Sequence, residues 1–373
     1  MRVVELRDLA SLEAIRGAWS ELADRIAEDS PYLTPEFLLP WLRFLPTPYD
    51  CRVLTAWEGS RLLGLAPVFD RRLGLPGLGF SLRSFPISGA TPPLDVLADP
   101  PEEVFEAFVR HWKENGGWDL IRLSNLRADS PTEAFLRAAA LRHGLRLSSE
   151  LSERQHLLPI RGTWEEYCRS RSKRFRRSLT YDRNCCERIG PIELVTFPSA
   201  QAERTLEDVM GMAFEVTRRS WKRVEGGGTR FERFFLDLAA EMLAAGQLSL
   251  RVLLLGGRPA AYLFEIAYRG NLHAFHMAYD LELQQASPGM VIVAEALKDA
   301  HARGCGRYDF GGTARYLEHW TKTTAAFNEV RLTRNGPLAR SKAALYLRIH
   351  RGRRARTEER REATKVARKA EPS

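Results

Sequence analysis

The chain has 373 residues, a size that favours two domains over one. Hydrophobic residues make up 44% of the chain and aromatic residues 10%, which excludes a wholly disordered protein. The formal charge of +9 is concentrated in residues 161–190 and 340–373. We therefore expect a basic connector and a basic, solvated tail on a body that is slightly acidic.

The apolar segments are too short for a membrane span. Those that begin at Arg251 and Pro259 are soon interrupted by Gly, Arg or Glu. The amino terminus carries charges where a signal peptide has an apolar core. These features predict a cytoplasmic protein.

Cysteine and histidine give no metal or disulfide pattern. The five cysteines are odd in number and lack a CxxC pair, which argues against a disulfide framework or a zinc site. His273 and His276 are the one close histidine pair, in a run typical of a strand. Because their separation is odd, we expect them on opposite faces of that strand, and we predict no metal site.

In the first half, apolar spacing and turn residues predict helix, strands, helix and strand in turn. The predicted elements are a helix over 10–29, two strands within 52–72, a Gly/Pro-rich stretch over 73–95, a helix over 102–115 and a strand over 118–126. An Arg-rich connector over 164–190 follows, with a helical pattern.

The second half repeats this order. The predicted elements are helices over 204–221 and 230–246, a three-strand meander over 248–280, a helix over 288–304 and a strand over 307–312.

Short motifs recur in the two halves. The tripeptide RVL opens a hairpin at 52–54 and again at 251–253, each time with glycine at the turn. A helix, glycine, an aromatic-Asp pair and a strand also recur, with the pairs at 118–119 and 308–309. We therefore predict an α/β fold of two duplicated mixed-sheet units, with chance similarity of hairpins as the alternative. The predicted domains are 1–150 and 155–345, followed by a basic tail over 346–373.

The helix start near residue 288 has features of an anion site. Ser287 fits an N-cap, Pro288 fits the first helical position, and Gly289 permits close approach of a ligand. The amides of Gly289, Met290 and Val291 would then donate to a phosphate group. An ordinary capped helix is the alternative. The corresponding region of the first half is rich in proline, so we expect the second unit to be the active one.

A series of motifs resembles a known family. Six motifs occur in the order seen in GNAT-like acetyltransferases of the CelD/BcsL family. They are LTPEFLLPWLRFL, SKRFRRSLTYDRN, RRSWK, the run ending in AYD, the SPGM helix start and YDFGG. The resemblance covers roughly residues 30–345 and implies a tandem GNAT-like fold with acyl transfer from a CoA thioester to an amine. The chain departs from the usual GNAT pyrophosphate signature, since Pro288 stands where a glycine is expected. YDFGG also resembles Fem-type peptidyltransferases, which use aminoacyl-tRNA.

Acyl transfer to an amine requires a base, an oxyanion donor and an acid for the departing thiolate. The candidate bases are Asp309 and Asp280, each near a strand end, and Glu265 inside an apolar strand. Tyr279 or Tyr308 is the candidate acid. Each has a structural alternative: turn closure for the aspartates, a partnered core carboxylate for Glu265, and packing for the tyrosines.

Two further residues are candidate substrate contacts. Trp221 precedes a Gly-rich segment and would wall the acceptor cleft, with core packing as the alternative. Lys322 would meet a phosphate, with a solvated surface lysine as the alternative.

The sequence thus predicts an acyl-CoA-dependent N-acyltransferase, using acetyl-CoA or another acyl-CoA and no metal. The resemblance implies an amino sugar, glycan precursor or other small amine as acceptor, in bacterial polysaccharide or cell-envelope synthesis. A Fem-type transferase and a non-catalytic polysaccharide-assembly protein are the alternatives. The basic connector and tail leave contact with tRNA or an anionic membrane surface open, the latter as peripheral attachment at the inner membrane. The connector's five clustered cations are Arg171, Lys173, Arg174, Arg176 and Arg177.

Overall fold

The computed structural model describes residues 1–26, 29–44, 50–75, 78–85, 92–199, 204–222 and 229–349. The Gly-rich segment after Trp221 and most of the predicted basic tail lie outside these residues, although 337–349 are helical. No helix within the described ranges is long and apolar enough to span a membrane.

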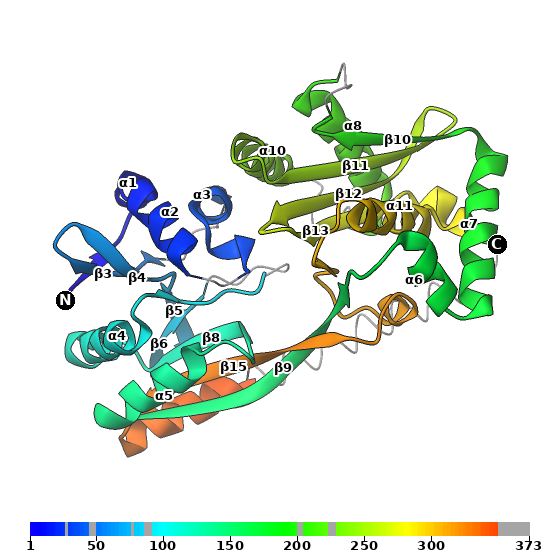
Figure 1. Cartoon of the computed structure of the whole chain (residues 1–373). Helices are drawn as coiled ribbons and strands as arrows, with labels where there is room; N and C mark the ends of the chain where they lie inside the picture. Colours follow the sequence, from blue (N-terminus) through cyan, green and yellow to red (C-terminus); the bar gives the residue numbers. More distant parts are fainter. Residues whose placement is uncertain are drawn as a thin grey trace.

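The first unit occupies the left of Figure 1. Its elements are β1 (Arg2–Leu6), α1 (Leu9–Ala14), α2 (Arg16–Arg25), η1 (Pro31–Leu33), α3 (Pro35–Phe44), β2 (Asp50–Cys51), β3 (Val53–Glu58), β4 (Arg61–Ala66), β5 (Phe69–Leu75), β6 (Leu78–Ser84), β7 (Leu97–Ala98), α4 (Pro101–Asn115), β8 (Leu120–Arg127) and α5 (Thr132–Arg142). The predicted helix over 10–29 is divided into α1 and α2, because the backbone at Ile15 leaves helical geometry. The predicted Gly/Pro-rich stretch contains β6, which pairs with β5.

The second unit lies at the upper right of Figure 1. Its elements are α6 (Trp164–Ser170), α7 (Lys173–Ile189), β10 (Ile192–Phe197), α8 (Leu206–Arg219), α10 (Thr229–Ala244), β11 (Leu248–Leu255), β12 (Arg258–Tyr268), β13 (Asn271–Tyr279), η2 (Leu281–Ala286), α11 (Pro288–Ala302), β14 (Arg307–Asp309) and η3 (Arg315–His319). Helices α8 and α10 cover one face of its sheet, and α6, α7 and α11 cover the other.

Two long strands join the units, β9 (Leu145–Pro159) and β15 (Thr324–Arg334). They run together across the bottom of Figure 1. Strand β9 pairs with β14 at one end and with β15 along most of its length, and β15 also pairs with β8. The result is one sheet in the order β10-β11-β12-β13-β14-β9-β15-β8-β6-β5-β2, beside a smaller sheet β1-β3-β4-β7. Strand β15, inside the predicted second domain, thus extends the sheet of the first unit.

The two units share a series of elements in the same order. Each series has a strand and helices, then a hairpin, and then a helix that leads to a parallel strand. Helix α5 follows this series in the first unit, and α6 and α7 precede it in the second. Leu54 lies in β3 between β1 and β4, and Leu253 lies in β11 between β10 and β12. Both hairpins turn at glycines with positive φ, Gly59 in the first and Gly256-Gly257 in the second. The fold is therefore a tandem arrangement of two mixed α/β units.

Candidate functional site

Strands β13 and β14 run parallel and then separate. Their pairing consists of Leu272 with Tyr308 and His273 with Asp309. Beyond Asp309 the chain turns at Gly311, where φ is +59° and a Cβ atom would lie 2.4 Å from the Ala274 carbonyl oxygen. Only glycine fits this close approach. Asp309 therefore lies at the vertex of a wedge between the two strands.

A pocket of about 330 Å³ lies along the free part of β13; we call it the wedge pocket. Its walls come from β13, from η2 and the start of α11, from η3, and from the segment after α8. The lining residues are Trp221, Met277, Tyr279, Gln284, Ser287, Gly289, Met290 and Tyr316. Five of them, Trp221, Tyr279, Ser287, Gly289 and Met290, are predicted site residues. The structure thus brings together candidates that lie up to about 70 residues apart in sequence.

Aromatic side chains form one wall of the wedge pocket. The rings of Trp221 and Tyr279 have centroids 4.6 Å apart. Burial raises the pKa of Tyr279. Burial also raises the pKa of Tyr316 to about 12, and the neighbouring Tyr279 adds to this shift. Both phenols therefore keep their protons at neutral pH. The sequence analysis did not predict Tyr316, because it lies after the last predicted strand and outside every motif used to select site residues.

The start of α11 differs in detail from the sequence expectation. Ser287 occupies the N-cap position with φ +53°, and its side chain makes no capping hydrogen bond. The amides of Met290 and Val291 donate to the Ser287 carbonyl oxygen at 2.9 and 3.4 Å. The expectation of three free amides is therefore corrected: within the described residues, Gly289 alone of the three offers an unpaired N–H. The Val291 side chain is buried and faces away from the wedge pocket, toward α7.

Two of the predicted bases are held in ion pairs. Asp280 is fully buried, and its Oδ2 accepts from Arg219 Nε at 2.7 Å and from an Arg258 amino group at 2.6 Å. Its Oδ1 accepts from the Glu282 amide and so starts η2. Glu265 is fully buried, and its Oε2 accepts from Arg251 Nε at 2.8 Å. These carboxylates are engaged in structure, in the way that partnered core charges usually are.

Asp309 differs from these two. It is 8% exposed, and its Oδ1 accepts from the Gly311 amide at 2.9 Å. No ion pair to Asp309 occurs among the described residues. Of the three candidate carboxylates, it is the one without an arginine partner among the described residues, although it does not line the wedge pocket.

Tyr308 and Lys322 lie outside the wedge pocket. Tyr308 is fully buried on the α11 side of the sheet, where burial and the nearby Glu265 carboxylate raise its pKa well above the usual value. Lys322 is on the surface, with its side chain 75% exposed and paired with Glu318 at 3.4 Å. Neither residue lines the pocket, but Tyr308 lies near enough to the pocket residue Tyr316 for an electrostatic interaction.

A buried polar chain that sequence reasoning missed ends at His276. Thr217 Oγ1 donates to the Ala213 carbonyl oxygen and lies 2.9 Å from the Tyr262 hydroxyl, which lies 2.6 Å from His276 Nδ1. The Thr217 hydroxyl proton is already donated to Ala213, so the Tyr262 hydroxyl donates to Thr217 Oγ1. The Tyr262 oxygen must then accept from His276, which carries its proton on Nδ1. Nε2 is then the acceptor nitrogen. Burial, with a smaller effect of Lys222, holds the pKa of His276 well below its usual value, so the ring is neutral at pH 7.

The expectation that His273 and His276 lie on opposite faces is wrong. The register between β12 and β13 shifts at Phe275, so one residue is added and the alternation of faces is reset. His273 packs against Tyr32, and His276 packs against Phe235, both on the face that α3 and α10 cover. Among the described residues, no group of three or more His, Cys, Asp or Glu side chains is placed to hold a metal ion.

We expect the neutral state of His276 to make stability depend on pH. His276 stays neutral in the native protein, whereas in the unfolded chain it becomes protonated below about pH 6.5. The free energy of unfolding should therefore fall as the pH decreases below that value. The slope from one such group is at most about 1.4 kcal/mol per pH unit. Urea unfolding between pH 5 and 7.5 measures it. His276→Gln should remove this part of the slope and exposed His319→Gln should not; equal slopes in the two variants would contradict the assignment.

Part of the chain is similar in sequence to a known family. A family model described as an acetyltransferase (GNAT) domain matches residues 173–320. This span contains the wedge pocket and both diverging strands. Over residues 173–320 the chain is thus similar to a GNAT acetyltransferase domain.

Solved structures extend the likeness beyond the GNAT domain to both units. FemX is similar with a TM-score of 0.59 and 13% identity, covering 91% of this chain and 99% of FemX. A protein of unknown function from Bacteroides thetaiotaomicron gives a TM-score of 0.54 and 14% identity, covering 89% and 100%. The C-terminal domain of a putative lysylphosphatidylglycerol synthetase from Agrobacterium fabrum gives 0.53 and 12%, covering 91% and 95%. No curated protein sequence matches the chain. At these identities the likeness establishes the fold alone.

Proposed function

We propose that the chain is an acyl-CoA-dependent N-acyltransferase whose GNAT domain carries the reaction and whose first unit supports it. The observation that carries this proposal is the wedge pocket, which joins predicted donor-binding and acceptor-binding residues where β13 and β14 separate. The resemblance to the CelD/BcsL family suggests an amino sugar or a related small amine of envelope polysaccharide synthesis as the acceptor.

The residues of the wedge pocket fit part of a CoA thioester. Two methionines and three aromatic side chains suit the pantetheine arm and an acyl group, and about 330 Å³ is within the range of ligand sites. The unpaired Gly289 amide at the start of α11 would donate to a phosphate oxygen. A cation that would complete a diphosphate site is absent from the described residues that line the pocket.

The side chains around the wedge suit transfer to an amine. CoA supplies an acyl carbonyl attached to a thiolate leaving group. Asp309, at the vertex, takes the proton that the amine loses as the C–N bond forms. Tyr279 or Tyr316 donates a proton to the sulfur as the C–S bond breaks. His276, with Nε2 as acceptor, is the rival base, and Asp280 and Glu265 position the strands through their arginine partners.

A Fem-type aminoacyl-tRNA transferase is the second candidate. The similarity to FemX and the basic connector favour it. A tRNA-dependent enzyme should bind charged tRNA with strong salt dependence, whereas a CoA enzyme has no such requirement. A thermal-shift series with acetyl-CoA, longer acyl-CoAs, free CoA and charged tRNA tests both, because any ligand of the native state raises the melting temperature. Stabilisation by tRNA but by no CoA compound would overturn our proposal.

Gly289→Asp should weaken acyl-CoA binding at least tenfold, since a carboxylate at this helix start repels a phosphate group; tenfold corresponds to about 1.4 kcal/mol. Titration calorimetry measures the affinity, and circular dichroism verifies that the variant folds. A Cβ atom at Gly289 would lie 3.2 Å from Tyr279 Cδ1, so any side chain causes a small displacement. Gly289→Asn is therefore the matched control with the same shape and no charge. Equal affinities of the two variants would remove Gly289 from the phosphate site.

A further inference from the structure

Helix α7 carries a stripe of cations that the proposed reaction does not use; we call it the basic stripe. At about 100° of rotation per residue, its members fall within an arc of about 100° and extend over roughly 22 Å of the helix. They are Lys173, Arg174, Arg177 and Arg188. All four are exposed, and none has an ion pair or hydrogen bond within the part of the chain that the structure describes.

Neighbouring cations of α7 have structural roles, in contrast to the basic stripe. Arg176 donates to the carbonyl oxygens of Arg169 and Arg171 and so caps α6. Arg183 pairs with Glu187 and with Glu295 of α11. Of the α7 acids, Asp182 is buried on the core side, and Glu187 lies between Arg183 and the stripe and pairs with Arg183. The four stripe cations therefore outnumber the acids beside them.

A groove of about 360 Å³ lies beside the stripe, between α6, α7 and α11. Its floor is mostly apolar and includes Trp164, Leu179, Val291 and Ala294. Its rim carries the three cations Arg176, Arg183 and Lys298. Within the arc of the stripe, Tyr181 is 60% exposed. The same end of the molecule thus combines positive charge with exposed apolar surface.

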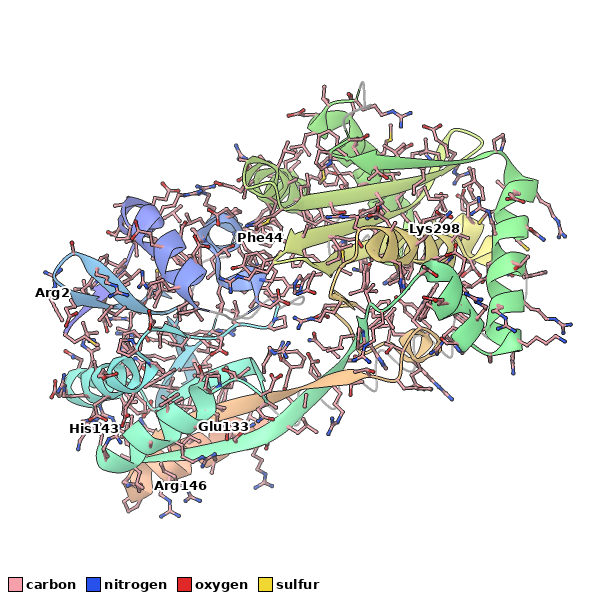
Figure 2. The ribbon with its side chains drawn as sticks, viewed as in Figure 1. Arg2, Phe44, Glu133, His143, Arg146 and Lys298 are labelled. Atoms are coloured by element: carbon pink, nitrogen blue, oxygen red, sulfur yellow. The ribbon has the colours of Figure 1, made fainter. Side chains whose placement is uncertain are left out.

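We propose that α7 and this groove dock the protein on a membrane surface rich in anionic phospholipids. The stripe complements the headgroup phosphates, and the groove takes apolar lipid surface. RNA bases stack on aromatic rings, and of the described residues that line the groove only Trp164 has one; the other apolar residues of the floor are aliphatic, which favours lipid over RNA. Figure 1 places α7 along the right edge of the molecule, and Figure 2 shows its long side chains pointing into solvent there, with Lys298 to the left of them on α11. This edge is open to a broad surface.

Docking at this end would place the wedge pocket close to the membrane. The groove and the wedge pocket use opposite sides of the first turn of α11, since Val291 lines the former and Gly289 and Met290 line the latter. The inference does not depend on which donor the GNAT domain uses. It predicts that acceptors at the membrane surface are the accessible ones.

Vesicle binding of the full chain tests the proposal. Vesicles of phosphatidylcholine with 30 mol% phosphatidylglycerol should bind it, and vesicles of phosphatidylcholine alone should not. Each cation contributes roughly fivefold to partitioning, so the variant Lys173→Gln, Arg174→Gln, Arg177→Gln, Arg188→Gln should bind about 10²- to 10³-fold more weakly. Binding of the native chain should also weaken as salt is added.

A matched control removes the same charge from the other unit. The variant Arg2→Gln, Arg72→Gln, Arg110→Gln, Arg146→Gln changes four exposed arginines of the first half. Figure 2 shows Arg2 and Arg146 far from α7. This control should bind vesicles within about fivefold of the native chain. The proposal is overturned if the two variants bind equally, if removal of residues 350–373 alone abolishes binding, or if the stripe variant loses tRNA binding while vesicles bind neither form.

Discussion

Asp309→Asn should lower the turnover of acyl transfer by about 10²- to 10⁴-fold, the usual contribution of a positioned base. The amide keeps the shape of the carboxylate and can still accept from the Gly311 amide, but it cannot take the proton of the amine. The strands should therefore stay in place, and the affinity for the acyl donor should not change. Turnover is measured as thiol release from acetyl-CoA with the best amine of a panel, and donor affinity is measured by calorimetry.

His276→Gln and Asp280→Asn rank the rival bases in the same assay. His276→Gln removes the acceptor nitrogen at the end of the buried chain from Thr217. Asp280→Asn leaves Arg219 and Arg258 without their charge partner, so we expect it to lower stability before it lowers turnover. If Asp309→Asn remains near native turnover while His276→Gln collapses, His276 is the base. If all three remain active, the amine arrives already neutral or another group takes its proton.

Arg251→Met should destabilise the fold by about 3–5 kcal/mol, because it leaves a buried carboxylate without its charge partner. Arg251 is 2% exposed, and it donates to Glu265 and to Asp299 at 2.8 and 2.7 Å. Burial alone would lower the pKa of Arg251, but the two carboxylates raise it above its usual value. Chemical denaturation, followed by tryptophan fluorescence, measures the loss.

Two further variants separate charge burial from a general loss of contacts. Arg303→Met removes the exposed partner of Asp299 and should cost at most about 1 kcal/mol. The double variant Arg251→Met, Glu265→Leu removes both buried charges and should recover most of the stability. A double variant that is less stable than Arg251→Met would show that the pair is net stabilising, contrary to our expectation.

The hydrophobic periodicity of the sequence was sufficient to predict the local elements of the second unit. Helices α8, α10 and α11 and the meander β11–β13 lie where apolar spacing and turn glycines indicate them, because each depends on residues close in sequence. The repeated hairpins at Gly59 and Gly256 likewise predicted the tandem fold. Strands β9 and β15 were not predicted, since both alternate polar and apolar residues weakly and pair with each other across more than 150 residues of sequence.

The sequence predicted several residues of the candidate site, but it did not predict that they lie together. The motifs around Trp221, Tyr279 and Ser287 could be selected by residue type, but nothing in their spacing shows that they share one pocket. The burial of Glu265 beside Arg251 depends on strand register, and the common face of His273 and His276 depends on the β12–β13 bulge. The sequence by itself determined which residues can donate, accept or take a proton. The tertiary structure decided which of those groups are already paired, because a partner far away in the chain is brought near only by the packed sheet.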